Sequence, residues 1–195
     1  GIPGTADQVD ELFPVALVIL LLGPPVAGLS LTGICHGKKG FRELGARLLR
    51  CRVGLKWYVI ALLTVPILAS AVMSLVSEEY LPAVLTSDDL TTVILSGLGA
   101  GIMGGLLEEL GWTGFALPEL RREHGPLASG LIIGFVWGGW HVLVTVWASG
   151  DPSGAFSWEL FLPPFIFYIA VLPIFRVLIV WLYDATESLL LVMLM

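Results

Sequence analysis

Residues 90–117 read LTTVILSGLGAGIMGGLLEELGWTGFAL, an apolar stretch interrupted by a single pair of charges, Glu108 and Glu109. About 20 apolar residues are enough to cross the hydrocarbon core of a bilayer as an α-helix. This stretch is long enough to span, and it is too apolar for the surface of a water-soluble domain. It therefore predicts a transmembrane helix that carries two carboxylates.

Other apolar stretches have the same character, and charged residues make up only 13% of the chain. A soluble domain carries about 25% charged residues, so this chain has too little polar surface to form one. The predicted spans are Leu12–Ile34, Trp57–Val76, Leu90–Leu117, Leu127–Ala148 and Leu160–Leu182. A further apolar run from Ser188 to Met195 is too short to span, which indicates a missing C-terminal piece. The prediction is an all-α, multi-pass transmembrane helical bundle with five full spans and a truncated sixth, in a single domain over residues 1–195.

The loops between these spans alternate in charge. Most of the ten Lys and Arg residues fall between Cys35 and Lys56, and threading the spans back and forth brings all ten to one side. The positive-inside rule then predicts a cell-membrane protein with its N-terminus outside and its basic loops in the cytoplasm. The basic side also holds Arg121, Arg122 and Arg176, and the acidic side holds Asp7, Asp10, Glu11, Glu78, Glu79, Asp88, Asp89, Asp151 and Glu159.

The basic segment between the first two spans carries further expectations. Residues 41–50, FRELGARLLR, predict a short amphipathic helix on the inner leaflet. Cys35 and Cys51 flank the basic loop and indicate no disulfide framework. Without a soluble domain to carry it, a nucleic-acid role is not expected, and the lipid bilayer is the first partner. The oligomeric state stays open.

Glu108 and Glu109 do not belong in lipid. A carboxylate at the centre of a bilayer costs roughly 2.5 to 3.5 kcal/mol on insertion scales, so a buried pair predicts function. The alternative is that both emerge at the interface, but the apolar residues 110–117 that follow argue against it. Gly97, Gly101 and Gly105 recur every fourth residue ahead of the pair, which predicts a face packed closely on other helices.

His141 is a second polar residue inside an apolar span, in residues 134–147, GFVWGGWHVLVTVW. A lone histidine there is often only a hydrogen-bonding link between helices. Gly134, Gly138 and His141 share a helix face, and Trp137 lies one turn earlier. Because the loop over residues 118–126 is short, this span and the one with the glutamates are expected to be neighbours.

This set of residues permits hydrolysis inside the membrane. One glutamate could act as a general base for water, and a histidine could orient that water, stabilise an oxyanion or bind a metal. The candidate catalytic residues are Glu108, Glu109 and His141. The same three would be the ligands if a divalent metal such as zinc is used, although they lack HExxH spacing and the cofactor stays open. The same residues could also serve proton-coupled transport.

Residues 108–120, EELGWTGFALPEL, and 135–141, FVWGGWH, resemble the motifs of the CPBP family of CAAX-protease and bacteriocin-processing membrane proteins, also called Abi. The first motif, E-E-x-x-x-R, matches at Glu108 and Glu109 and has Thr113 in place of its Arg. The second, F-x-x-x-H, matches at His141 with Trp137 in place of Phe. A final H-x-x-x-N or H-x-x-x-D motif would fall after Met195. Similar segments, LGPPVAGL, RVGLKWYVIALL and RVLIVWLYDATESLL, extend the resemblance over nearly the whole chain.

The resemblance implies a membrane-embedded endopeptidase that cuts peptides or lipidated proteins with a glutamate-activated water. It assigns Glu108 as the general base, Glu109 as its partner and His141 as an orienting or oxyanion-stabilising residue. Eukaryotic members are similar in cutting prenylated CAAX proteins, and bacterial members are linked to peptide processing and immunity. Thr113 and the absent last motif favour an alternative, a catalytically inactive relative that acts by binding. A proton-coupled transporter is the other alternative.

Overall fold

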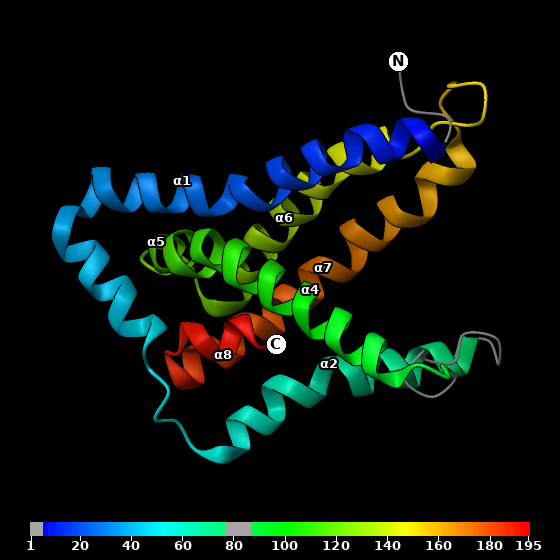
Figure 1. Ribbon diagram of the computed structural model, residues 1–195. Helices are drawn as coiled ribbons and strands as arrows, with labels where there is room; N and C mark the ends of the chain where they lie inside the picture. Colours follow the sequence, from blue (N-terminus) through cyan, green and yellow to red (C-terminus); the bar gives the residue numbers. More distant parts are fainter. Residues whose placement is uncertain (1–5, 77–86) are drawn as a thin grey trace.

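The computed structural model describes residues 6–76 and 87–195, and it is helical throughout apart from loops and one isolated bridge between Gly150 and Phe156. Glu78, Glu79 and the side chains of Asp7, Asp10 and Glu11 lie outside the described residues. The long helices are α1 (Ala6–Leu48), α2 (Leu55–Val76), α4 (Leu90–Gly111), α6 (Pro126–Trp147) and α7 (Trp158–Thr186) (Figure 1). The short ones are the π-helical turn η2 (Trp112–Ala116), α5 (Leu117–Leu120) and α8 (Leu189–Met193).

The described residues contain five helical segments that are long and apolar enough to cross a membrane. They are Pro14–Leu48, Leu55–Val72, Leu90–Leu120, Pro126–Trp147 and Trp158–Thr186. The predicted all-α, multi-pass fold is therefore confirmed. The short sixth element also begins where expected, because the Ser188 hydroxyl accepts a hydrogen bond from the Leu191 amide and caps α8.

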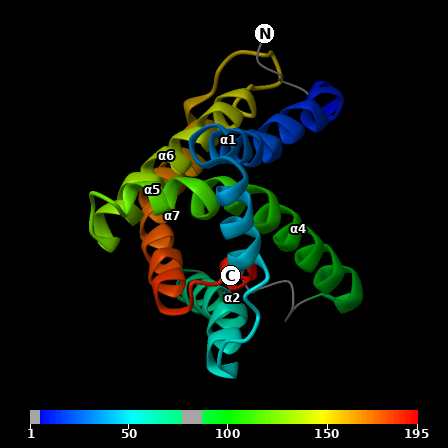
Figure 2. The same ribbon diagram turned by 90° about the vertical axis from the view of Figure 1, so that its left-hand side faces the viewer.

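The first helix continues beyond the predicted end of its span. Gly37 adopts φ 56° and ψ −146° inside α1, a conformation open to glycine, and the helix changes direction there. Figure 2 shows the second half of α1 (cyan) running away from the first half (blue). In this second half, predicted to be an amphipathic helix on the leaflet, Leu44 is buried against Leu189 and Met193 of α8. Its apolar side therefore packs partly on protein.

Among the described helices, α6 and α7 pack over the largest contact, and glycines make this contact possible. Gly130, Gly134 and Gly138 follow one another at every fourth position on the buried side of α6. A Cβ atom on any of them would overlap atoms of α7, at Val177, Pro173 and Tyr168 respectively. Glycine at these positions lets the two backbones approach closely.

The packing of α4 differs from the prediction. A Cβ atom on Gly97 or Gly101 would meet no other helix within 4 Å in the described part of the chain, so the expected close packing at these two positions is wrong. Gly105 does pack, against the backbone of Met193 in α8, and Gly111 meets the backbone of α1. The helix starts at Leu90, capped by Asp89, whose pKa is lowered by the hydrogen bond that it accepts from Thr92.

The helices α4 and α6, predicted to be neighbours, share little of their length. The extensive partner of α4 is α1 and that of α6 is α7. Both pairings have a close contact at glycines, which lets the two backbones approach. The short loop between α4 and α6 does not by itself make these two helices pack together. Side chains still bridge α4 and α6 at one level, and that level is the candidate site.

Candidate active site

Glu108 and Glu109 lie in the last turn of α4 and are both buried, with 8% and 4% of their surface exposed. The π-helical turn η2 follows at once and begins at Trp112. Its second residue, Thr113, is also buried, and the Thr113 hydroxyl donates a hydrogen bond to Glu109 Oε2. The carboxylates are thus enclosed by the protein, and neither emerges at its surface. Such π-helical turns often occur at functional sites.

Trp137 connects Glu108 to His141. The indole Nε1 of Trp137 donates a hydrogen bond of 2.6 Å to Glu108 Oε2. One turn later, His141 Nδ1 lies 2.8 Å from the backbone oxygen of Trp137. A carbonyl only accepts, so Nδ1 carries the proton and a neutral His141 presents Nε2 as an acceptor. Tyr168 of α7 stacks on the imidazole at 4.7 Å between ring centroids and holds its orientation.

Arg176 is a further polar residue of the candidate site, which the sequence pattern does not single out. It was assigned to the basic end of the fifth span, but its side chain is fully buried inside the bundle. Nη1 of Arg176 donates to Glu109 Oε2 at 2.8 Å and lies 3.4 Å from Thr113 Oγ1. The guanidinium also lies 4.2 Å from the ring centroid of Trp137. A signal was present, because an arginine within an apolar run is itself an intramembrane charge.

The two glutamates are therefore in different environments. Glu109 accepts hydrogen bonds from Thr113 and Arg176 and has an ion-pair partner. Glu108 accepts one from Trp137, which is neutral, and has no ion-pair partner among the described residues. The structure thus brings all three predicted residues to one region, with the charge of Glu109 neutralised at short range and that of Glu108 not.

The predicted residues do not form a ligand set for a metal in this arrangement. Among the described residues, no group of three or more His, Cys, Asp or Glu side chains could hold a metal ion. Glu109 is instead engaged by a guanidinium. Arg176 Nε and Nη2 and Trp112 Nε1 are buried polar atoms without a hydrogen-bond partner among the described residues. Buried donors of this kind usually bind water or a ligand.

A polar cavity of about 550 Å³ lies next to the π-helical turn. Arg47 of α1 joins the two, because Nη2 donates to the Gly114 oxygen at 2.7 Å and Nη1 to the Tyr183 hydroxyl at 3.1 Å. The cavity is lined by both signs of charge, including the ion pairs His36–Glu119, Arg122–Glu119, Arg121–Asp184 and Arg50–Glu187. We call it the polar vestibule.

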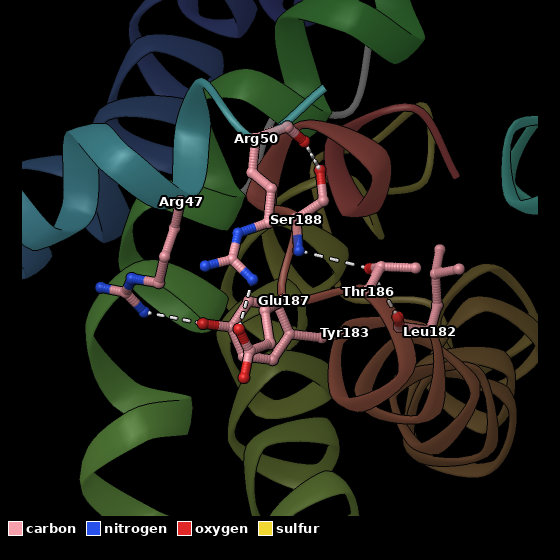
Figure 3. A network of polar contacts seen from close by, with 7 residues as sticks. All are labelled: Arg47, Arg50, Leu182, Tyr183, Thr186, Glu187 and Ser188. Atoms are coloured by element: carbon pink, nitrogen blue, oxygen red, sulfur yellow. Dashed lines mark hydrogen bonds and ion pairs between the residues drawn. The ribbon is translucent and has the colours of Figure 1, made fainter. Parts of the chain in front are cut away.

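The turn between α7 and α8 closes one side of the vestibule (Figure 3). Glu187 ends α7 in a left-handed conformation, with φ 51°, and pairs with Arg50. Ser188 follows, and its hydroxyl donates to the backbone oxygen of Arg50 at 2.6 Å. These contacts attach the start of α8 to the end of α1 and hold the two walls of the vestibule together.

Two apolar grooves lie along the first half of α1. One of about 300 Å³ lies between α1 and the π-helical turn and includes Trp112 and Trp140. The other, of about 330 Å³, lies between α1 and the end of α6 and also includes Trp140. Trp140 Nε1 donates to the Leu20 oxygen of α1 at 3.2 Å, between the two grooves. The π-helical turn that follows the glutamates thus borders the polar vestibule and one of the apolar grooves.

A multi-pass helical membrane protein with a buried glutamate pair, a histidine and an arginine at one level is the class that the fold and the site define. A family model, type II CAAX prenyl endopeptidase Rce1-like, matches residues 90–195, which include all four of these side chains. The chain belongs to this family. No curated protein and no solved structure matches it.

Proposed function

We propose that this chain is a membrane-embedded endopeptidase, organised as one transmembrane domain, in which Glu108 activates the attacking water. The observation that carries the proposal is the pair of contacts that Trp137 makes with Glu108 and His141. They hold a carboxylate and an imidazole on two helices at the same level, as a general base and its assisting group require. Membership in a family of prenyl endopeptidases supports the same chemistry.

In the proposed reaction, Glu108 takes a proton from water while the water oxygen adds to the scissile carbonyl carbon. His141 Nε2 accepts a hydrogen bond from the second O–H group of the water, which keeps its hydrogen, and so orients the nucleophile; this role suits the tautomer with a proton on Nδ1. The C–N bond then breaks, and Glu108 returns the proton to the leaving amine. Glu109 is unsuited to be the base, because Arg176 stabilises its charged form.

The surroundings of the site favour a substrate with a polar and an apolar part. The polar vestibule would hold peptide, and the grooves beside α1 and Trp140 would hold an apolar side chain or lipid. A lipidated peptide or protein at the membrane surface has both parts. The family description, which specifies a prenyl endopeptidase, supports this substrate class.

The direct test is cleavage by the purified protein in liposomes. We expect it to hydrolyse a prenylated CAAX peptide faster than the same peptide without the lipid. In water enriched in ¹⁸O, one heavy oxygen should enter the new carboxylate, as water attack requires. A protein that binds the prenylated peptide but never cleaves it would support the binding-only alternative instead.

We also propose that the polar vestibule faces the cytoplasm, with the N-terminus of the chain outside. Nine of the ten Lys and Arg remain as topology markers once the buried Arg176 is removed, and four of them line this cavity. Cys51, in the α1–α2 loop, is an exposed free thiol at this end of the molecule. In a Cys35→Ser background, a membrane-impermeant maleimide should label it only after the cells are opened.

The matched control for this labelling uses the loop at the opposite end. Pro152→Cys, in a chain without other cysteines, places a thiol in the exposed α6–α7 loop. It should react in intact cells. The reverse pattern, with Cys51 labelled in intact cells and position 152 protected, would contradict the proposed orientation.

A further inference from the structure

We infer that Arg176 is a positioning residue of the active site, which holds Glu109 from α7 and so leaves Glu108 as the free base. The inference rests on the proposed function for its catalytic consequence. Its structural part is independent of that function, because it concerns which residue neutralises Glu109. Neither the match to a family nor the sequence motifs assign a role to position 176.

Burial makes a purely structural role for Arg176 a poor explanation. Both side chains of the Arg176–Glu109 pair are withdrawn from solvent, with 0% and 5% exposed. Removing two charges from water is unfavourable, and buried ion pairs can often be replaced by apolar side chains without loss of stability. The neighbours of Arg176 along α7, Phe175 and Val177, are apolar. If position 176 served only for packing, an apolar residue would be expected there too.

Arg176 contacts Glu109 directly and is linked to Glu108 through Trp137. Nη1 bonds directly to Glu109, while the planar guanidinium lies against the Trp137 ring, whose Nε1 bonds to Glu108. An arginine can make both contacts at once because its flat, delocalised cation stacks on an aromatic face and still donates at its edge. One side chain of α7 therefore stabilises the position of a carboxylate on α4 and of a tryptophan on α6.

Position 113 shows that the guanidinium comes from an unexpected helix. Thr113 lies one turn after Glu109, bonds to the same carboxylate oxygen, and is 3.4 Å from Arg176 Nη1. A long side chain at position 113 could reach the same place from within the helix that carries Glu109. Arg176 thus supplies from α7 the charge that Thr113 cannot provide. The lack of an arginine at position 113 is then no argument for an inactive protein.

The test moves the charge between helices. R176M should lower kcat for peptide cleavage by about 100-fold, as for a displaced catalytic group, with a smaller change in KM. Its melting temperature in detergent should fall, because Glu109 loses its partner. T113R/R176M, which returns a guanidinium from the π-helical turn η2, should recover most of both losses. K39Q, which removes an exposed cation that pairs with Glu43, is the control and should match the wild type.

A neutral pair separates positioning from structure. In E109Q/R176M both charges of the Arg176–Glu109 pair are removed together, so the melting temperature should return while kcat stays low. Recovery of kcat in this variant, or failure of T113R/R176M to recover either property, would overturn the inference. If the wild type cleaves no peptide, the proposed function fails, and the melting temperatures of the same variants still decide whether Arg176 and position 113 are interchangeable.

Discussion

Glu108→Gln should lower kcat for peptide cleavage by about 10³-fold while leaving the protein folded. General bases contribute roughly 10²–10⁴-fold, and glutamine cannot take a proton from water. Its amide oxygen can still accept the hydrogen bond from Trp137 Nε1, which lies 2.6 Å from the Glu108 carboxylate. Because the substitution also removes a buried charge, the melting temperature should stay the same or rise.

The measurement is a progress curve in liposomes together with a melting curve in detergent for the same preparation. Glu123→Gln provides the matched control, because Glu123 is a carboxylate in the turn after α5 that is exposed, whereas the glutamate pair is buried. It should retain full activity. Cleavage by Glu108→Gln at the wild-type rate would remove Glu108 from the mechanism and leave His141 as the residue to test next.

Gly134→Ala should destabilise the protein and disable the site together. The new methyl group would overlap the backbone of Pro173, so α6 and α7 could pack only by moving apart. Overpacking of this kind costs about 1–3 kcal/mol or more. Trp137 and His141 lie on α6 and Arg176 on α7, so the same movement should lower kcat by about 100-fold.

Gly139→Ala is the matched control on the same helix. A Cβ atom at this position has no neighbour within 4 Å among the described residues. Since alanine favours a helix over glycine by about 0.5–1 kcal/mol, this variant should be as stable as the wild type or slightly more so. Thermal unfolding and cleavage would be measured side by side. Equal effects of the two substitutions would mean that close approach at Gly134 is unimportant.

Hydropathy was enough to predict the helical fold because length and apolarity alone decide whether a segment can span. The structure places α6 at Pro126–Trp147, close to the predicted Leu127–Ala148. Where the prediction fell short, the cause was local or tertiary. The bend of α1 depends on the φ of Gly37, and nothing in the pattern of apolar residues indicates it.

Glycine spacing shows the limit of pattern alone. Gly97 and Gly101 in α4 have the same four-residue spacing as Gly134 and Gly138 in α6, yet only the pair in α6 meets another helix among the described residues. The spacing indicates only that one face of the helix has no bulky side chains and would allow another helix to approach closely. Which helix then packs against that face depends on the shape of the partner, and this information lies elsewhere in the chain.

The catalytic candidates could be predicted from the sequence, but the ion pair between Glu109 and Arg176 could not. An intramembrane carboxylate or imidazole is rare enough to identify Glu108, Glu109 and His141 directly. Arg176 has the same property, but a basic residue toward the end of a span also fits the positive-inside rule, which predicts a place on the basic side of the membrane. Its contact with Glu109 joins residues 67 positions apart, so only the tertiary structure distinguishes the two interpretations.

Because the guanidinium lies on α7, substitutions at positions 113 and 176 are expected to depend on each other during evolution. Loss of Arg176 before any replacement would strand a buried carboxylate, whereas gain of an arginine at position 113 first would crowd two cations around one glutamate. Either order passes through an unfavourable intermediate, so the two arrangements are separated by a barrier in sequence space. Descendants of one arrangement should therefore keep it. Across the family, we expect an arginine at either position 113 or position 176, and not at both.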